Sequence, residues 1–365
     1  EKQTTGDVRI EFYAAIKTAE PFLPAGTVIA REQTYVHTFY KKEATAQQPA
    51  TSKEEGNLVA FSGPDFKATF DKQSGLLTSY LYKKHEYILN GQGPRPFFWR
   101  APTDNDYGAN LPVRLKAWKE ASYQEPKAES FQVTPGSNAT TVKVTYRFPQ
   151  TEARWNITYK IYASGVIKVD NRFMAEGDQA PMIPRVGLRM QLPESFTDLT
   201  YYGRGPKENY RDRRTSQFIG EYAIPVKDMY EPYVRPQENN HRTDIYWCAL
   251  TDKTQRGLLL IADRTFELNA SNYPLESMDS GDTIDNGAPR TEKTHHRHLT
   301  DPLPEKMVDL FIDYRMMGVG GDDSWGATAH EPYLIRPGKE NAIEYGFSLV
   351  PFDKKEDYKY LIRQY

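Results

Sequence analysis

Apolar and polar residues alternate with a period of two along most of this chain, and that pattern restricts the fold more than any other feature. Four segments place apolar side chains at about every second position: residues 141–148, 154–162, 166–173 and 185–192. Half-buried strands show this alternation because successive side chains point to opposite faces of a sheet. Residues 257–262 are apolar throughout and predict a central strand that is covered on both faces.

Helical periodicity is scarce. The strongest candidate covers residues 113–122 and follows Pro112, a residue type favoured at helix starts. Strands at short, even spacing with almost no helices indicate an all-β sandwich rather than an alternating α/β fold. We therefore expect an all-β protein.

One stretch divides the chain. Residues 41–56 are polar, contain no aromatic side chain and follow no period, so we expect an interdomain linker there. Residues 1–40 hold two or three strands, too few to bury a sandwich core, and are expected to close another domain. Residues 57–365 are expected to form one large β domain. Because the chain begins at Glu1 and shows no signal peptide, we expect a processed product or an excised fragment.

Charge and hydropathy argue against several classes of partner. The 47 Lys and Arg residues nearly balance the 49 Asp and Glu residues, whereas nucleic-acid binders gather a basic excess. No apolar run approaches the roughly 20 residues that cross a bilayer, so no membrane partner is expected. Cys248 is the single cysteine, which excludes an intramolecular disulfide and a multi-cysteine metal cage. It suits a reducing cytoplasm and also an unbridged periplasmic protein, so the compartment stays open.

Five polar clusters interrupt the strand pattern and are candidates for a functional site. The first starts at Arg100 and contains Asp104, Asn105 and Asp106. Acidic residues around an amide can bind calcium, but the rest of an EF-hand loop is missing. We favour a structural turn in which these side chains bond nearby backbone amides and pair with Arg100.

The second and third clusters contain residue types that recognise sugars. Arg204, Glu208 and Asn209 could bind a hydroxyl-rich ligand or form a rigid corner between strands, and both interpretations stay open. Glu238 and His241 lie on one stretch and could act as base and acid at a sugar anomeric centre. A hydrogen-bonded loop is the favoured interpretation for that pair.

The last two clusters are histidine-rich and glycine-rich. Three histidines within residues 295–298 suggest a metal site, but their spacing fits one face poorly, so no metal is expected. Residues 317–326 contain Asp322, Asp323 and Trp325 among four glycines. Loops on a rigid β scaffold concentrate function, and Trp325 is a candidate platform for stacking a sugar ring. The alternative is a tryptophan that caps the sandwich edge.

Taken in order, six motifs resemble the C-terminal domain of bacterial β-galactosidases of the LacZ type, in glycoside hydrolase family two. They are RAPTDND from Arg100, GRGPKENY from Gly203, DMYEPYV from Asp228, QEN from Gln237, HRHL from His296 and GVGGDDSW from Gly318. The resemblance covers about residues 57–350 and implies a large antiparallel supersandwich, similar in fold to galactose mutarotase. Residues 1–40 look like the closing strands of the immunoglobulin-like β-sandwich that precedes this domain in the family.

The resemblance also implies that catalysis and part of the substrate contact belong to different domains of the enzyme. In the family a TIM barrel carries the two catalytic glutamates, and the barrel's alternating strand and helix pattern does not occur in this chain. No catalytic residue is therefore carried over, and the isolated chain is expected to be inactive. The family role that maps onto this sequence is that of Trp325, which reaches into the active site and contacts the aglycone side of the substrate. Asp322 and Asp323 accompany it as candidate substrate-binding residues.

The expected function is that of a C-terminal, non-catalytic part of a β-galactosidase that hydrolyses terminal non-reducing β-D-galactose residues. Its expected partners are β-galactoside sugars and a catalytic barrel upstream in the same polypeptide, in a homo-oligomeric parent enzyme. No cofactor is expected in this chain, and Mg, Na or Ca would be the metals of the parent. The alternatives are a free-standing aldose 1-epimerase and a carbohydrate-binding module.

Overall fold

The computed structural model describes residues 6–39, 47–177, 182–279, 298–323, 325–336, 338 and 340–364. The chain divides into two units, one made of residues 1–45 and 359–365 and the other of residues 46–358. Strands dominate the described residues, and each of the few helices is short. The all-β class is confirmed.

The smaller unit contains one antiparallel pair, β1 (Gly6–Ala15) and β2 (Val28–Phe39). Large apolar side chains on both strands are exposed, including Phe12 and Ile29. A two-stranded ribbon is marginally stable by itself in water, because it has no second layer to cover such side chains. The assignment of this ribbon to an immunoglobulin-like domain stays a prediction.

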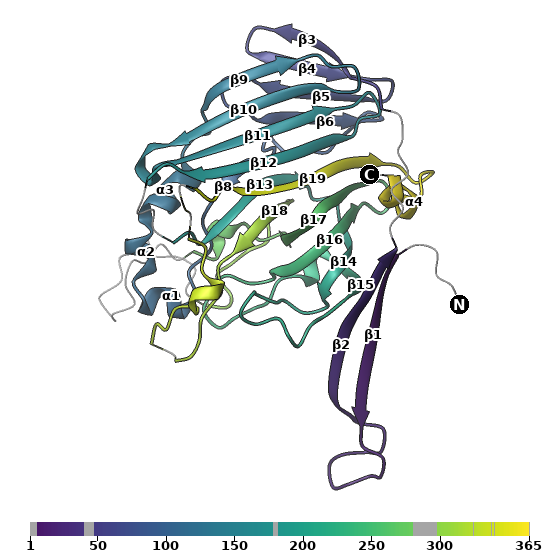
Figure 1. The fold of residues 1–365 in the computed structure, drawn as a ribbon, viewed down its shortest axis with the longest axis vertical. Coiled ribbons are helices and arrows are strands. Elements are labelled where there is room, and N and C mark those ends of the chain that lie inside the picture. The colour runs from purple at the N-terminus through teal and green to yellow at the C-terminus, as the bar shows by residue number, and fades with distance from the viewer. Residues whose placement is uncertain are drawn as a thin grey trace. The chain divides into compact units, whose positions relative to one another are not determined.

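The larger unit contains a broad antiparallel sheet whose main strand order is β15-β14-β16-β17-β19-β12-β11-β10-β9 (Figure 1). Its strands are β9 (Ala128–Thr134), β10 (Thr140–Phe148), β11 (Ala153–Ile161), β12 (Ile167–Ala175), β14 (Asp198–Gly205), β15 (Phe218–Pro225), β16 (Arg242–Thr251), β17 (Gly257–Ser271) and β19 (Ile343–Phe352). Off this path, β18 (Met307–Met316) pairs with β17 and β13 (Arg185–Pro193), and β13 also pairs with β8 (Arg95–Phe97). The predicted central strand lies in β17, where residues 257–261 are buried between β16 and β19.

A second sheet consists of β3 (Thr51–Glu55), β4 (Leu58–Ser62), β5 (Phe66–Asp71), β6 (Leu77–Tyr82) and β7 (His85–Glu86). β3 lies within the range expected to be a linker, and it pairs with β4 along its full length. The expected linker is therefore too long at its C-terminal end. All five β3 residues are exposed at the sheet edge, so they carry no apolar alternation for sequence reasoning to detect.

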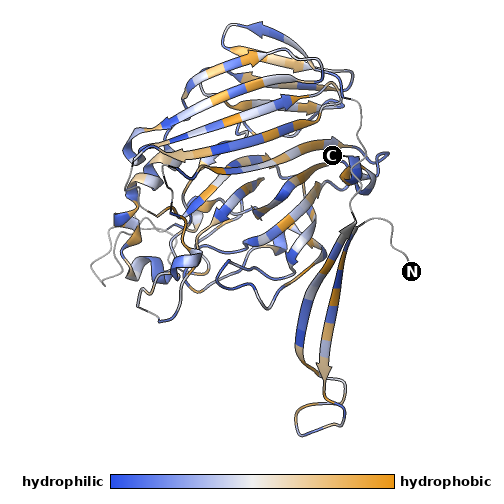
Figure 2. Cartoon of the chain, in the orientation of Figure 1, coloured by the Kyte–Doolittle hydropathy of each residue, from blue (hydrophilic) through white to orange (hydrophobic). Residues whose placement is uncertain are grey.

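Aromatic side chains fill the core between and beside the sheets. Phe70 of β5 contacts Tyr159 of β11 with ring centroids 5.0 Å apart, which joins the two sheets. Phe98 lies 4.9 Å from Phe148 and 5.0 Å from Trp118, ring centre to ring centre. Figure 2 shows the alternation of apolar and polar residues along the strands. Most aromatic residues thus serve sheet packing.

The helical elements are α1 (Asp104–Gly108), α2 (Leu111–Arg114), α3 (Lys116–Tyr123), α4 (Tyr358–Gln364), η1 (Pro149–Thr151), η2 (Val226–Asp228), η3 (Leu275–Ser277) and η4 (Glu331–Tyr333). The single helix expected over residues 113–122 is divided between α2 and α3 at Leu115, whose backbone leaves the helical region. Helix α2 begins at Leu111, so Pro112 lies inside its first turn and not just before the helix as expected. Within the described part of the chain, no helix is long and apolar enough to cross a membrane.

Candidate functional site

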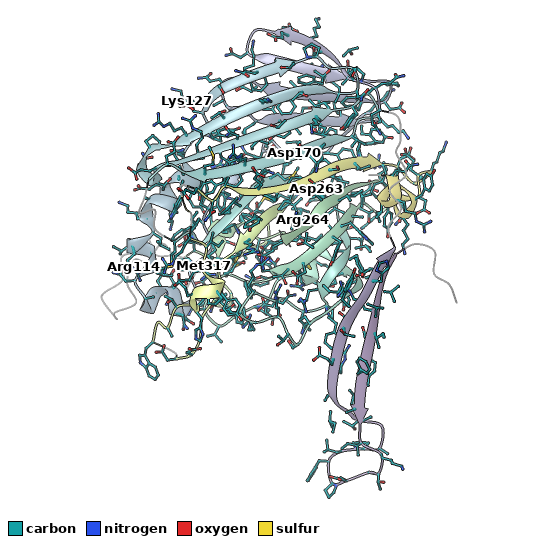
Figure 3. All side chains as sticks on the ribbon, viewed as in Figure 1. Arg114, Lys127, Asp170, Asp263, Arg264 and Met317 are labelled. Atoms are coloured by element: carbon teal, nitrogen blue, oxygen red, sulfur yellow. The ribbon has the colours of Figure 1, made fainter. Side chains whose placement is uncertain are left out.

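The loop after β18 displays Trp325. It leaves the sheet at Met317, which Figure 3 labels. The Trp325 side chain is 82% exposed, which does not fit a tryptophan that caps the sandwich edge. Oδ1 of Asp323 accepts hydrogen bonds from the backbone amides of Trp325 at 2.9 Å and Ala327 at 3.0 Å. These bonds favour the carboxylate and lower the pKa of Asp323, so a charged turn fixes the backbone beneath the indole.

Arg100 holds the base of this loop. Its guanidinium donates to the carbonyl of Met317 at 2.7 Å and to that of Gly318 at 3.1 Å. The same group pairs with Asp106 through two bonds of 2.8 and 3.0 Å, and both side chains are buried. Asp212 completes the base by accepting from the amide of Gly320 at 2.8 Å. The expected pairing of Arg100 with an acid of its own cluster is present in the structure.

Helix α1 supports the outer part of the loop. Thr103 and Asp106 form a reciprocal capping box at its start, which orients the helix. Asn105 then donates from Nδ2 to the carbonyls of Asp323 at 3.1 Å and Ala327 at 3.2 Å. A Cβ added at Gly108 would overlap the backbone oxygen of Trp325, so helix and loop touch backbone to backbone.

The other acids of the two clusters remain near the surface. Asp104 is exposed and lies 3.7 Å from Nη1 of Arg235. Asp322 accepts from Nε2 of His330 at 2.5 Å, and this bond raises the pKa of that histidine. Among the residues that the structure describes, no group of three or more His, Cys, Asp or Glu side chains could hold a metal ion.

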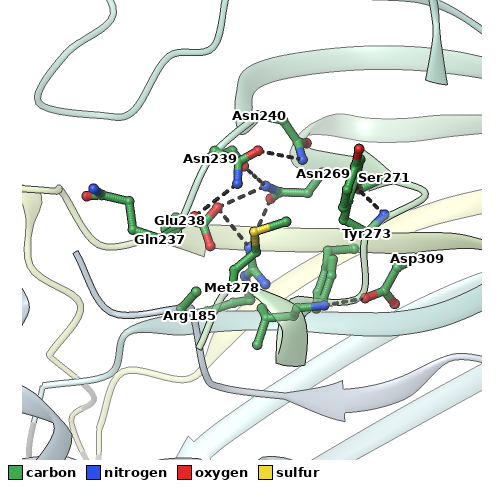
Figure 4. Close-up of a pocket in the computed structure, with 13 residues that line it drawn as sticks. Arg185, Gln237, Glu238, Asn239, Asn240, Asn269, Ser271, Tyr273, Met278 and Asp309 are labelled. Carbon is green, nitrogen blue, oxygen red and sulfur yellow. Dashed lines mark hydrogen bonds and ion pairs between the residues drawn. The ribbon is translucent and has the colours of Figure 1, made fainter. Parts of the chain in front are cut away.

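Glu238 and His241 belong to a buried network instead of an open sugar site, and Figure 4 shows the part of it around Glu238. The ring nitrogens of His241 lie 2.6 Å from Oδ1 of Asn269 and 2.9 Å from Oε2 of Glu267. Oε1 of Glu238 accepts from Asn269 at 2.9 Å. The cavity beside Glu238 has about 30 Å³, which is room for one or two water molecules and too little for a sugar. This arrangement supports the structural interpretation of the pair.

Sequence reasoning missed the charges on the strands beneath this network. Arg185 of β13 lies 3.1 Å from Asp313 of β18, Nε to Oδ2, and both are fully buried. Burial raises the pKa of Asp313 to about 7, and the Arg185 charge opposes that rise. The available signal was a pair of like charges four residues apart on each strand: Arg185 and Arg189 on β13, and Asp309 and Asp313 on β18.

The cluster around Arg204 forms a corner whose polar groups bind one another. Arg204 pairs with Asp244 at 2.8 Å. The Nδ2 of Asn209 donates to two backbone carbonyls at 3.0 Å each, and its Oδ1 accepts from Thr243. Glu208 pairs with Arg213 at 2.6 Å. These contacts support the rigid corner over the ligand-binding interpretation. Of the histidine cluster, only residue 298 lies within the described residues.

The matching family model and the curated relatives of this chain belong to the same family. The family model described as β-galactosidase small chain matches residues 62–349. A β-galactosidase of Priestia megaterium is 33% identical over 291 residues, which are 80% of this chain and 26% of that protein. A β-galactosidase of Streptococcus thermophilus is 27% identical over 348 residues, 94% of this chain and 32% of that protein. The chain thus spans about a quarter to a third of the length of these curated relatives.

Solved structures of low identity also match. A galactose 1-epimerase from Lactobacillus acidophilus is 7% identical, with a TM-score of 0.43 over 85% of this chain and 99% of that chain. An aldose epimerase homologue from C. elegans is 8% identical, with a TM-score of 0.41 over 79% and 96%. Because the family model covers most of the sequence, this chain belongs to the β-galactosidase small chain family.

Proposed function

We propose that this chain is the C-terminal, non-catalytic part of a β-galactosidase and that Trp325 lines the aglycone side of its substrate site. The whole enzyme would remove terminal β-D-galactose residues from β-galactosides, with both catalytic glutamates on a barrel upstream in the same polypeptide. The relatives named above are β-galactosidases of which this chain matches a part. A homo-oligomeric parent, and Mg, Na or Ca as its metals, remain part of this proposal.

The observation that carries the proposal is an exposed indole on a loop held at both ends. Arg100 and Asp212 bond the backbone of residues 317–320, while Asn105 bonds that of residues 323 and 327. Single exposed apolar side chains are common on protein surfaces, so the proposal depends on the ordered loop that displays the indole. The face of a sugar ring stacks well on an indole, and a loop that is already ordered loses little entropy on binding.

The epimerase alternative is weaker than this proposal. Epimerisation needs an acid and a base that reach the ring oxygen and the anomeric hydroxyl. Here both His241 nitrogens contact side chains of the protein, and the cavity beside Glu238, of about 30 Å³, is too small for a hexose. Polarimetry of fresh α-galactose with the isolated chain should therefore give the rate of the uncatalysed reaction.

The decisive experiment replaces Trp325 by Ala in the full-length polypeptide and measures kcat and KM on lactose. The expected result is a higher KM with hydrolysis retained, because the indole binds substrate but takes no part in bond cleavage. Leu303→Ala is the matched control, since Leu303 is another exposed apolar side chain of the same unit. Unchanged kinetics on lactose would contradict the role of Trp325. Turnover of a chromogenic β-galactoside by the isolated chain would contradict its non-catalytic role.

A further inference from the structure

A second hollow lies at the opposite end of β18 from the Trp325 loop. It has a volume of about 300 Å³, within the usual range for small-molecule sites, and its walls include Arg95, Tyr123 and Met307. β18 begins at Met307 and ends at Met316, one residue before the loop. Ten strand residues span about 30 Å, so one small sugar could not occupy both places.

Two residues that line this hollow each carry a buried polar atom with unmet hydrogen-bonding capacity. The hydroxyl of Tyr123 and the Nε of Arg95 are buried, and neither has a hydrogen-bond partner among the described residues. The rest of each side chain is fixed: the Tyr123 ring meets Phe97 edge to face at 5.5 Å, and Arg95 donates from Nη2 to the carbonyl of Ser122. Buried polar groups are normally satisfied, so these two atoms leave hydrogen-bonding capacity unused in the wall of the hollow.

The charges around the hollow favour a neutral ligand. Arg189 is neutralised by two bonds of 2.8 Å to Asp309, and it also bonds Glu276 at 2.6 and 2.7 Å. Of the charged groups that line the hollow, Arg95 and Arg189 are opposed by Glu276 and Glu305. This balance gives no net attraction for an anion.

The chemistry of the lining is that of a polyol site. Arginine and tyrosine donate hydrogen bonds, glutamates and amide oxygens accept them, and a sugar hydroxyl can do both. Met190, Met307 and the Tyr123 ring supply apolar surface for the C–H face of a pyranose. We propose that this hollow, the Arg95–Tyr123 pocket, binds a neutral mono- or disaccharide.

Tyr123→Phe in the 365-residue chain tests the proposal sharply. The substitution removes one hydroxyl and keeps the ring that packs on Phe97. Because that hydroxyl has no partner in the described chain, the midpoint of urea unfolding should stay unchanged or rise. Binding of galactose, lactose and maltose is followed by saturation-transfer NMR. The apparent dissociation constant of the bound sugar should increase roughly three- to tenfold, the effect of one lost hydrogen bond.

Tyr159→Phe is the matched control: its hydroxyl is also buried without a hydrogen-bond partner among the described residues, and Tyr159 does not line the hollow, so this variant should leave the affinity unchanged. The proposal is overturned if none of the three sugars binds saturably, if Tyr123→Phe binds as tightly as the parent chain, or if Tyr159→Phe weakens binding as much as Tyr123→Phe does. Competition by inorganic phosphate at constant ionic strength would also overturn it, since the site would then select an anion. The role of Trp325 is read separately, from the kinetics of the full-length enzyme.

Discussion

Replacing Arg100 by Met would test whether a buried ion pair fixes the Trp325 loop. Methionine has a similar reach and is apolar, so the main change is the loss of the guanidinium. That loss removes both bonds to Asp106 and the bonds to the carbonyls of Met317 and Gly318. The Asp106 carboxylate would then stay buried without its cation. The backbone amide of Thr103, which donates to it at 3.0 Å, would be among the hydrogen-bond donors that it keeps.

The expected loss of unfolding free energy is about 3 kcal/mol. Removing one partner of a buried ion pair typically costs about 3–5 kcal/mol, and the bond retained from Thr103 places Arg100→Met at the lower end. Urea denaturation of the chain measures this difference. Arg172→Met is the matched control, because Arg172 pairs with Glu344 at 3.0 Å and both side chains are more than half exposed. An exposed pair contributes less than about 1 kcal/mol.

Two results would refute this reasoning. One is a loss for Arg100→Met no larger than that for Arg172→Met, which would mean that burial adds nothing to the pair. The other concerns the double variant Arg100→Met with Asp106→Leu. It should recover part of the lost stability, because the uncompensated carboxylate is the main cost. A double variant less stable than the single one would show that the lost loop bonds dominate instead.

Three further predictions concern single groups. Gly187→Ala should lower the free energy of unfolding by about 1–3 kcal/mol in urea denaturation, because the added methyl group would overlap Oδ1 of Asp313. An unchanged free energy of unfolding would show that Asp313 can move. The pKa of His330, measured by NMR, should lie above its ordinary value of about 6.5, and it should fall in Asp322→Asn. The stabilisation from this pair is complete below that ordinary value and is lost as the pH rises through the raised pKa. Burial raises the pKa of Cys248, so a thiol reagent should modify it in urea but not in buffer, and rapid reaction of the native chain would contradict the buried position.

Local patterns were enough to predict the strands and the candidate loop. The period-two alternation of β10 and β11 reflects the geometry of one strand, so it is visible without knowledge of the partner strand. The pairing of Arg100 with Asp106 was also predictable, because the two residues lie six positions apart around one turn. β3 was missed because an exposed edge strand buries nothing and leaves no apolar pattern.

Contacts between distant segments decided the rest. Glu238 and His241 looked like a possible acid and base until the structure placed Asn269 and Glu267, from another strand, against them. The Arg95–Tyr123 pocket has the same origin, since β8, α3, β13 and the start of β18 meet there. By itself the sequence determined the all-β class and the composition of the Trp325 loop, because both depend on neighbouring residues. Which polar groups are satisfied and which remain available to a ligand was decided only by the tertiary structure, because hydrogen-bond partners are brought together by folding.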